Sequence, residues 1–338
     1  MNTFGRIFRV HIFGESHGAC VGVTIDGCPA GLPLSVEDFV TDIERRKGGA
    51  KGTTPRKEDD LPIFKTGVFN SKTTGAPITI LFENNNTRSS DYEKQRDVPR
   101  PGHADFVANK KFGGYEDFRG GGHFSGRLTV SLVAGGVIAK KLLTLPLTPP
   151  GGGGIKVVAE LLEIGGEADI EKGLQKAIDA KDTIGGIVEC SVKGLPLGLG
   201  EPFFDSVESV ISHAVFAIPA VKAIEFGAGF AAAKMFGSEH NDALEDLTGK
   251  TKTNHAGGIV GGISNGNDLI FRIAVKPTSS TPKLQQTLNS NTGVQEDFSV
   301  KGRHDLCIAL RVPVVLEAVT AIVLADLMLL EQHIKRIL

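Results

Sequence analysis

The sequence predicts an α+β fold in which β-sheets cover helices that are buried inside the protein. The segment 314–337 has a helical pattern and is apolar on nearly all sides through Leu330, and such a helix must be buried on all sides. A second, mostly apolar helix is predicted over 128–145. Two buried helices favour sheets packed over a helical centre, unlike a doubly wound fold, in which helices cover the sheet.

A repeated motif indicates that the chain is internally duplicated. The pattern G-x-P-x-G-L occurs at 27–32 and again at 194–199. In each half a strand-like segment precedes the motif and an amphipathic helix follows it. We therefore expect a single domain, 1–338, with an internal pseudo-repeat of about 1–150 and 155–338.

The first half begins with strands. Their β-rich composition predicts strands at 8–13, 20–25 and 78–82. A helix is expected from Ser35 to Lys47, because Ser35 and Asp38 form a capping-box pattern and basic residues precede Gly48. The polar segments are predicted to be loops, and long polar loops are usually functional or disordered; these segments are 49–62 and 84–101.

The second half follows four glycines, 151–154, which we interpret as a hinge or linker. Strands are predicted at 187–192 and 269–275, from their content of β-branched and aromatic residues. An amphipathic helix is predicted at 205–217, before the apolar helix at 314–337.

Composition limits the possible functions. The chain has 338 residues, with 37 Lys and Arg against 39 Asp and Glu and a formal charge of −2, and this balance argues against a general nucleic-acid-binding protein. The four cysteines form no C-x-x-C pair and the N-terminus has no apolar leader, so we expect a reduced, cytoplasmic protein. Charges in both apolar helices argue against membrane spans. No histidine and carboxylate spacing indicates a metal site.

The turn at 14–18 contains the pattern G-x-S-x-G, so a serine hydrolase built on Ser16 must be considered. A nucleophile elbow requires a helix after the serine, whereas 19–25 has the pattern of a strand. A turn that presents His17 between two strands is the better interpretation.

Three further segments are candidates for binding an anion. Arg100 and His103 flank a Pro-Gly turn and can face one anionic group, although a surface turn capped by an aspartate explains the same pattern. The glycine-rich segment 119–127 leads into a helix, whose first N–H groups favour anions. Lys276 with the hydroxyls of 278–280 suits a phosphate, without the spacing of a P-loop.

Asp305 lies between the cation Arg303 and the start of an apolar helix. Such a carboxylate can act as a general base, although an N-cap or an ion pair is the more common role. No G-x-G-x-x-G opens a helix in a βαβ unit, which disfavours a dinucleotide-binding domain of the Rossmann type.

Together and in this order, these segments resemble the chorismate synthase family over nearly the whole chain. Three signatures carry the resemblance: G-E-S-H-G-x-x-x-G-x-x-x-D-G-x-P at 14–29, G-x-x-S-G-R-x-T at 122–129 and G-R-H-D-x-C at 302–307. Three shorter matches lie at 100–105, 254–258 and 276–280. Each match is weak alone, but six in order are specific.

The resemblance implies a lyase that removes phosphate from 5-enolpyruvylshikimate 3-phosphate by anti 1,4-elimination and releases chorismate, the last step of the shikimate pathway. It implies a requirement for reduced FMN without net redox change, and in some relatives NADPH as the reductant. It also implies a β-α-β sandwich with buried helices between antiparallel sheets, and a homotetramer.

The resemblance assigns roles to individual residues. His17 corresponds to the histidine that protonates the flavin, His103 to the one that protonates the leaving phosphate, and Asp305 to the carboxylate that helps remove the substrate proton. The expected FMN-binding residues are His123, Phe124, Ser125, Pro219, Ala220, Gly261, Lys276, Pro277, Thr278, Ser279, Ser280 and Arg303. Those expected at substrate or NADP are Arg46, Lys51, Arg100 and Arg127.

The chain departs from the family pattern mainly in one segment. His123 replaces an arginine, Phe124 a serine, Gly126 an alanine and Leu128 a glutamate, and Lys51 also stands where arginine is frequent. A flavin-binding relative without catalysis is therefore one alternative function, and a hydrolase using Ser16 is another.

Overall fold

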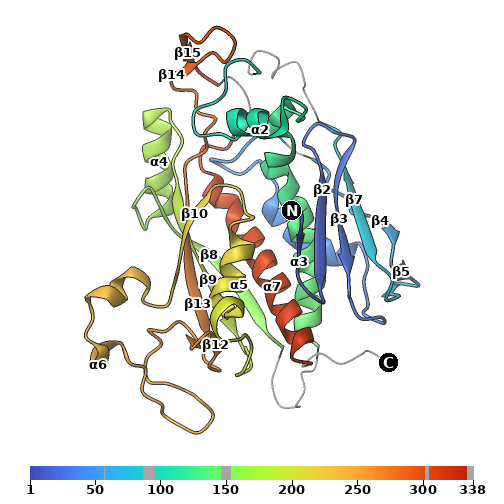
Figure 1. Cartoon of the computed structure of the whole chain (residues 1–338), viewed down its shortest axis with the longest axis vertical. Coiled ribbons are helices and arrows are strands. Elements are labelled where there is room, and N and C mark those ends of the chain that lie inside the picture. The colour runs from blue at the N-terminus through green and yellow to red at the C-terminus, as the bar shows by residue number, and fades with distance from the viewer. Residues whose placement is uncertain (57, 87–95, 146–153, 301–303, 333–338) are drawn as a thin grey trace.

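Two antiparallel sheets enclose a central layer of helices (Figure 1). The computed structural model describes residues 1–56, 58–86, 96–145, 154–300 and 304–332. The central helices α3 (Thr129–Leu143) and α7 (Val312–Leu330) run side by side between the sheets. The predicted α+β class, with buried helices between antiparallel sheets, is confirmed.

The N-terminal sheet contains the strands predicted in the first half. In order across the sheet, its strands are β1 (Thr3–Phe4), β2 (Arg9–Gly14), β3 (Cys20–Asp26), β7 (Ile78–Glu83) and β4 (Ile63–Thr66). Val23 of β3 lies opposite Ile80 of β7, and both side chains are fully buried. The apolar residues of these strands thus form one wall of the core.

The second sheet forms the opposite wall. Its strands, in order, are β10 (Val221–Phe226), β13 (Leu269–Val275), β9 (Gly186–Lys193) and β8 (Lys156–Ile164). Cys190 lies opposite Phe271, and both are fully buried. Three two-stranded pairs lie outside the sheets: β5 (Val68–Phe69) with β6 (Lys72–Thr73), β11 (Ile259–Val260) with β12 (Ile263–Ser264), and β14 (Gln285–Leu288) with β15 (Gln295–Phe298).

The remaining α-helices are α1 (Glu37–Arg46), α2 (Asp105–Phe112), α4 (Ile170–Ala180), α5 (Val207–Val215) and α6 (Gly237–His240). Half of the predicted capping box forms at α1, where Asp38 accepts a hydrogen bond from the Ser35 N–H at 2.8 Å. The N-cap position is Val36 rather than the predicted Ser35, and it has no side-chain cap. The helix consequently begins at Glu37.

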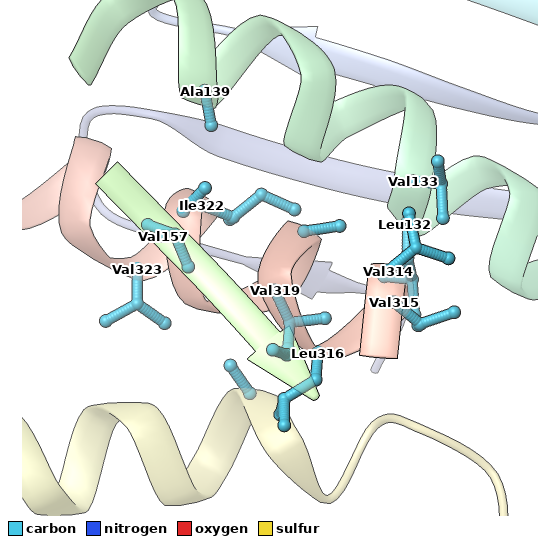
Figure 2. Packing of buried hydrophobic residues seen from close by; sticks show 14 of the residues in the cluster. Leu132, Val133, Ala139, Val157, Val314, Val315, Leu316, Val319, Ile322 and Val323 are labelled. Atoms are coloured by element: carbon cyan, nitrogen blue, oxygen red, sulfur yellow. The ribbon is translucent and has the colours of Figure 1, made fainter. Parts of the chain in front are cut away.

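The apolar core lies where α3, α7 and the sheets meet. In Figure 2, Leu132 and Val133 of α3 lie close to Val314 of α7, and Val157 of β8 lies beside the same helix. The buried side chains of both halves form one continuous cluster. The single core spans both halves, while the single domain and its repeat boundaries stay predictions.

Helix α7 is shorter than the sequence predicts. It ends at Leu330, and the exposed Glu331 and Gln332 follow, with Gln332 at a φ of 58°. Polar residues at this point cannot continue a helix that is buried on all sides. The rest of the predicted helix, 333–337, lies outside the described residues, as do glycines 151–153 of the predicted hinge.

The two G-x-P-x-G-L turns form the same hydrogen bonds. The Thr73 hydroxyl donates to Pro29 O at 2.6 Å and accepts from the Leu32 N–H at 2.9 Å. In the second half, Ser264 does the same with Pro196 O, at 2.6 Å, and with the Leu199 N–H, at 2.9 Å. Because a distant hydroxyl holds each turn in the same way, the resemblance of the halves extends beyond the motif.

The apolar helix α7 carries two buried carboxylates, and hydrogen bonds from the rest of the protein compensate both of them. Glu317 accepts hydrogen bonds from Arg45 and Lys140, each at 2.7 Å, and Asp326 accepts the backbone N–H groups of 6–8 at 2.7 to 2.8 Å. By length and composition the helical stretch Ile308–Leu330 is apolar enough to cross a membrane, but 89% of its apolar window is buried in the protein. It is a core helix.

Candidate functional site

A cavity of about 680 Å³ lies beside the N-terminal end of α3 and the first half of α7. Its size is within the range of pockets that hold small molecules and cofactors. Loops from both halves of the chain line it, together with the first residues of the N-terminus. The start of a helix favours a bound anion through its dipole and its unpaired N–H groups.

The cavity brings together sixteen of the residues that the sequence singled out. These are His17, Arg46, Arg100, His103, His123, Phe124, Ser125, Arg127, Pro219, Ala220, Lys276, Pro277, Thr278, Ser279, Ser280 and Asp305. Lys51 and Gly261 do not line it: Lys51 forms an exposed ion pair with Glu171 at 2.6 Å, and Gly261 follows β11 on the surface. Arg303 lies outside the described residues.

His17 is packed under the glycine-rich loop. Its side chain is almost fully buried, and Gly120, at a φ of 60°, lies so close that a Cβ there would collide with the imidazole. Burial first, and then the positive charges of Arg56 and Arg119, lower the pKa of His17 below its ordinary value. The imidazole is therefore held in its neutral form near pH 7.

Arg100, His103 and Asp105 form one hydrogen-bonded cluster. Arg100 donates to both Asp105 oxygens, through Nε at 2.7 Å and Nη2 at 2.8 Å, and His103 Nδ1 lies 2.6 Å from Oδ1. Arg100 Nη1 also donates to the Ser280 hydroxyl at 3.1 Å. The turn therefore joins the predicted phosphate-binding segment instead of being an isolated surface turn.

Asp305 is held from two directions. The Thr54 N–H donates to its Oδ1 at 2.8 Å, and Arg311 Nη1 lies 3.0 and 3.2 Å from its two oxygens. Asp305 is therefore not an N-cap, but it does form, with Arg311, the ion pair that the sequence offered as the more common role. It is an oriented carboxylate at the wall of the cavity.

Arg46 and Arg127 share one buried carboxylate, that of Asp60, which is 1% exposed. Arg46 also donates to the Thr129 hydroxyl at 2.9 Å and to the Gly126 carbonyl at 3.1 Å. Burial first, and then the neighbouring charges of Arg311 and Arg127, lower the pKa of Arg46 to about 9. These bonds hold the glycine-rich loop in place. Arg46 therefore has a structural role in the site, whether or not it also contacts a ligand.

The segment after β13 forms the opposite wall. Lys276 Nζ donates to Gly102 O at 2.8 Å and to the Ser279 hydroxyl at 2.9 Å. Next to it, Ala220 adopts a φ of 74°, a conformation that side chains rarely take, and its carbonyl accepts the Lys276 N–H at 2.9 Å. Strained backbone of this kind clusters at functional sites.

His123 and Phe124, which depart from the family pattern, both line the cavity. His123 places Nδ1 2.9 Å from Gly14 O and Nε2 3.1 Å from Asn2 Oδ1, so its imidazole ties the N-terminus to the cavity wall. Phe124 lines the cavity and is 41% exposed. His123 therefore does not extend toward a ligand as a freely reaching arginine would.

Several residues of the wall were missed by the sequence analysis. They are Thr54, Arg56, Glu58, Asp60, His304 and Arg311. Four of them belong to the polar loop 49–62, whose length marked it as functional or disordered without indicating which residues act. Basic side chains outnumber acidic ones at the cavity, with Arg46, Lys47, Arg56, Arg100, Arg127, Lys276 and Arg311 against Glu58, Asp60 and Asp305.

The hydrolase alternative conflicts with the local structure. Ser16 lies in the turn between β2 and β3 and is followed by a strand instead of a helix. Its hydroxyl is buried and has no hydrogen-bond partner among the described residues, so no base activates it.

Comparisons with known proteins identify the family of this chain. The family model for chorismate synthase matches residues 8–329. The chorismate synthase of Chitinophaga pinensis is 72% identical over 337 residues, covering 100% of this chain and 99% of that protein. The chorismate synthase of Methanocaldococcus jannaschii is 42% identical, covering 97% and 96% of the two chains.

A solved structure described as chorismate synthase has the same fold. It superposes with a TM-score of 0.70 at 26% identity, covering 97% of this chain and 93% of that chain. The matches extend over both halves and therefore over every loop that lines the cavity. The chain belongs to the chorismate synthase family and is an enzyme of that family, a lyase (EC 4.2.3.5) of the shikimate pathway.

Proposed function

We propose that this enzyme removes phosphate from 5-enolpyruvylshikimate 3-phosphate by anti 1,4-elimination to give chorismate, with reduced FMN as its cofactor. The observation that carries the proposal is the gathering of sixteen predicted site residues around one cavity. The substrate has two carboxylates and a phosphate, and the basic excess of the cavity wall complements these charges.

The cavity fits a flavin mononucleotide in its chemistry. Leu132, Val319 and Ile322 supply an apolar wall for a flat ring system, and Lys276 with the neighbouring hydroxyls supplies cationic and polar groups for a phosphate. Bound reduced FMN would supply transient electron density, which is why a reaction without net redox change needs it. Lys276, Ser279 and Ser280 would hold its phosphate.

Three residues would handle protons. His17 would protonate the reduced cofactor through its imidazole, whose lowered pKa makes the protonated ring a stronger acid. His103 would donate a proton to the leaving phosphate through Nε2, because its Nδ1 faces Asp105. Asp305 would accept the substrate proton at a carboxylate oxygen, oriented by Arg311. Arg100 would hold the leaving phosphate of the substrate beside His103.

We further propose that NADPH reduces the flavin, that the enzyme is a cytoplasmic homotetramer, and that Arg46, Lys51 and Arg127 serve substrate or NADP. All four cysteines are free, in accord with a reducing compartment. Four aromatic side chains of the second half are largely exposed and suit burial between subunits: Phe203, Phe204, Phe230 and Phe236.

An anaerobic assay with pre-reduced FMN and 5-enolpyruvylshikimate 3-phosphate tests the function through the absorbance of chorismate. We expect turnover. Tight FMN binding without product would instead favour a non-catalytic relative. Oxidation of NADPH in the presence of oxidised FMN tests the reductase activity separately.

A further inference from the structure

We propose that Asp105 is a positioning residue that fixes the proton and the orientation of the His103 imidazole. The inference rests on the proposed role of His103 as the acid for the leaving phosphate and deepens it. It follows from the hydrogen bonds around the Pro-Gly turn.

The contact with Asp105 determines which nitrogen of His103 carries the proton. His103 Nδ1 lies 2.6 Å from Asp105 Oδ1, and an ionised carboxylate can only accept a hydrogen bond, so Nδ1 must donate. Nε2 is then the nitrogen that can exchange a proton with a ligand. A Cβ at Gly121 would lie 3.4 Å from this Nε2, so the glycine-rich loop passes directly beside it.

Asp105 is itself fixed and ionised. Besides the two side-chain bonds from Arg100, its Oδ2 accepts the Arg100 backbone N–H at 3.1 Å. Burial alone would raise the pKa of Asp105, but the hydrogen bonds from Arg100 and His103 outweigh it and hold that pKa well below its usual range. Asp105 also begins α2, where the helix dipole favours a negative charge.

Other charged groups near His103 do not replace Asp105. Arg100 Nη2 lies 3.0 Å from His103 Nδ1, but it already donates to the same Asp105 oxygen. His304 lines the same cavity as His103. On the other side, Arg96, Glu116 and Asp117 line a small cavity that His103 also borders. Among the described residues, Asp105 is the acceptor that Nδ1 contacts.

If Asp105 acted only on helix α2, as an acidic residue in its first turn, Asp105→Asn should affect kcat no more than the same change at the start of another helix. Asp169 provides a matched control, because it caps α4 by accepting the Lys172 N–H at 3.1 Å and does not line the cavity. Asp169→Asn removes one charge from a helix start without touching a histidine. We expect it to retain the kcat of the wild type.

The kinetic test is a double-mutant cycle with kcat and KM measured separately at saturating reduced FMN. Asp105→Asn should lower kcat by at least about tenfold, as loss of an orienting carboxylate does in other histidine-dependent sites. In a His103→Ala background the same change should lower kcat by less than about twofold, because its effect passes through His103. An effect on KM alone, or the full loss of kcat in the His103→Ala background, would overturn the proposal.

A spectroscopic test needs neither flavin nor substrate. In protein labelled with ¹⁵N-histidine, at a pH high enough for the imidazole to be neutral and with His103→Ala for assignment, the nitrogen shifts of His103 should show the Nδ1–H tautomer. Asp105→Asn should shift it toward Nε2–H, because the amide can donate to Nδ1. An Nε2–H tautomer in the wild type refutes the positioning role even if the enzyme is active. Absence of chorismate formation in the wild type would refute the proposed function alone.

Discussion

Arg311 holds the Asp305 carboxylate with its Nη1 group 3.2 and 3.0 Å from the two oxygens. The same guanidinium donates through Nε to the Arg46 carbonyl at 2.8 Å. The carboxylate that we propose as proton acceptor is therefore fixed to the end of α1 as well as to the start of α7. Its orientation depends on a residue that need not touch the substrate.

Replacing Arg311 with methionine should lower kcat by at least about tenfold, because a general base that is free to rotate loses its alignment. Arg311→Lys should fall between this variant and the wild type, since lysine keeps the charge but cannot donate in the fixed geometry of a guanidinium. Steady-state kinetics with reduced FMN provides the measurement. Arg9→Met, which removes an exposed ion pair with Asp26, is the control. A wild-type kcat in Arg311→Met would show that Asp305 needs no such support.

Asp305 and Arg311 also show what a sequence can reveal about this site. Asp305 belongs to a signature and was found, whereas Arg311 lies six positions further, at the start of an apolar helix where no motif marks it. Asp60 was missed for a related reason: nothing in the polar loop 49–62 distinguishes a residue that will be buried. Burial of a charge depends on partners such as Arg46 and Arg127, which only the fold brings together.

Asp60→Ala should destabilise the protein by about 3 to 5 kcal/mol, because it leaves two buried guanidinium groups without their shared carboxylate. Denaturant unfolding followed by circular dichroism measures the change. Asp26→Ala is a suitable control, because its pair with Arg9 is exposed and such pairs contribute at most about 1 kcal/mol. A loss below 1 kcal/mol for Asp60→Ala would mean that water or a repacked loop compensates the two arginines.

Gly120→Ala should reduce activity more than it reduces stability. The new Cβ would collide with the His17 imidazole, so the histidine or the loop must move. Gly166→Ala is a matched control, because Gly166 has a similar φ of 79° but nothing lies within 4 Å of its Cβ position. Both variants carry the backbone strain of about 1 kcal/mol. Activity assays and thermal melts of the two variants separate strain from displacement of His17, and equal kcat losses would contradict this account.

The fold was easier to predict than the site, because its signals are local. The apolar pattern of 314–330 predicts a buried helix without reference to its neighbours. In the strands at 20–25 and 269–275, the sequence itself indicates which side chains face the core. The sequence predicts an end of α7 that is too late, because the helical pattern continues beyond Leu330, where the burial of the helix ends. Strand β8, with charges among its apolar residues, was not predicted at all.

Glu317→Gln should lose stability at neutral pH by about 1 to 3 kcal/mol, the usual cost of weakening hydrogen bonds to a buried charge. Burial raises the pKa of Glu317, but the hydrogen bond from Arg45 and the charge of Lys140 outweigh it, so that pKa lies below its ordinary value of 4.5. In the acid window below 4.5 the unfolded chain therefore binds more protons than the folded one, and acid removes this stabilisation.

The difference in unfolding free energy between wild type and Glu317→Gln should thus be full above pH 4.5 and narrow as the pH falls through the lower folded pKa. Denaturant titrations at several pH values from 7 down to 3.5 would follow it. Glu44→Gln is the control, because the Glu44 side chain is 60% exposed and its pair with Lys47 should contribute less than about 0.5 kcal/mol at every pH. A difference that widens as the pH falls would mean that Glu317 is protonated in the folded protein, and that Arg45 and Lys140 do not stabilise its charge.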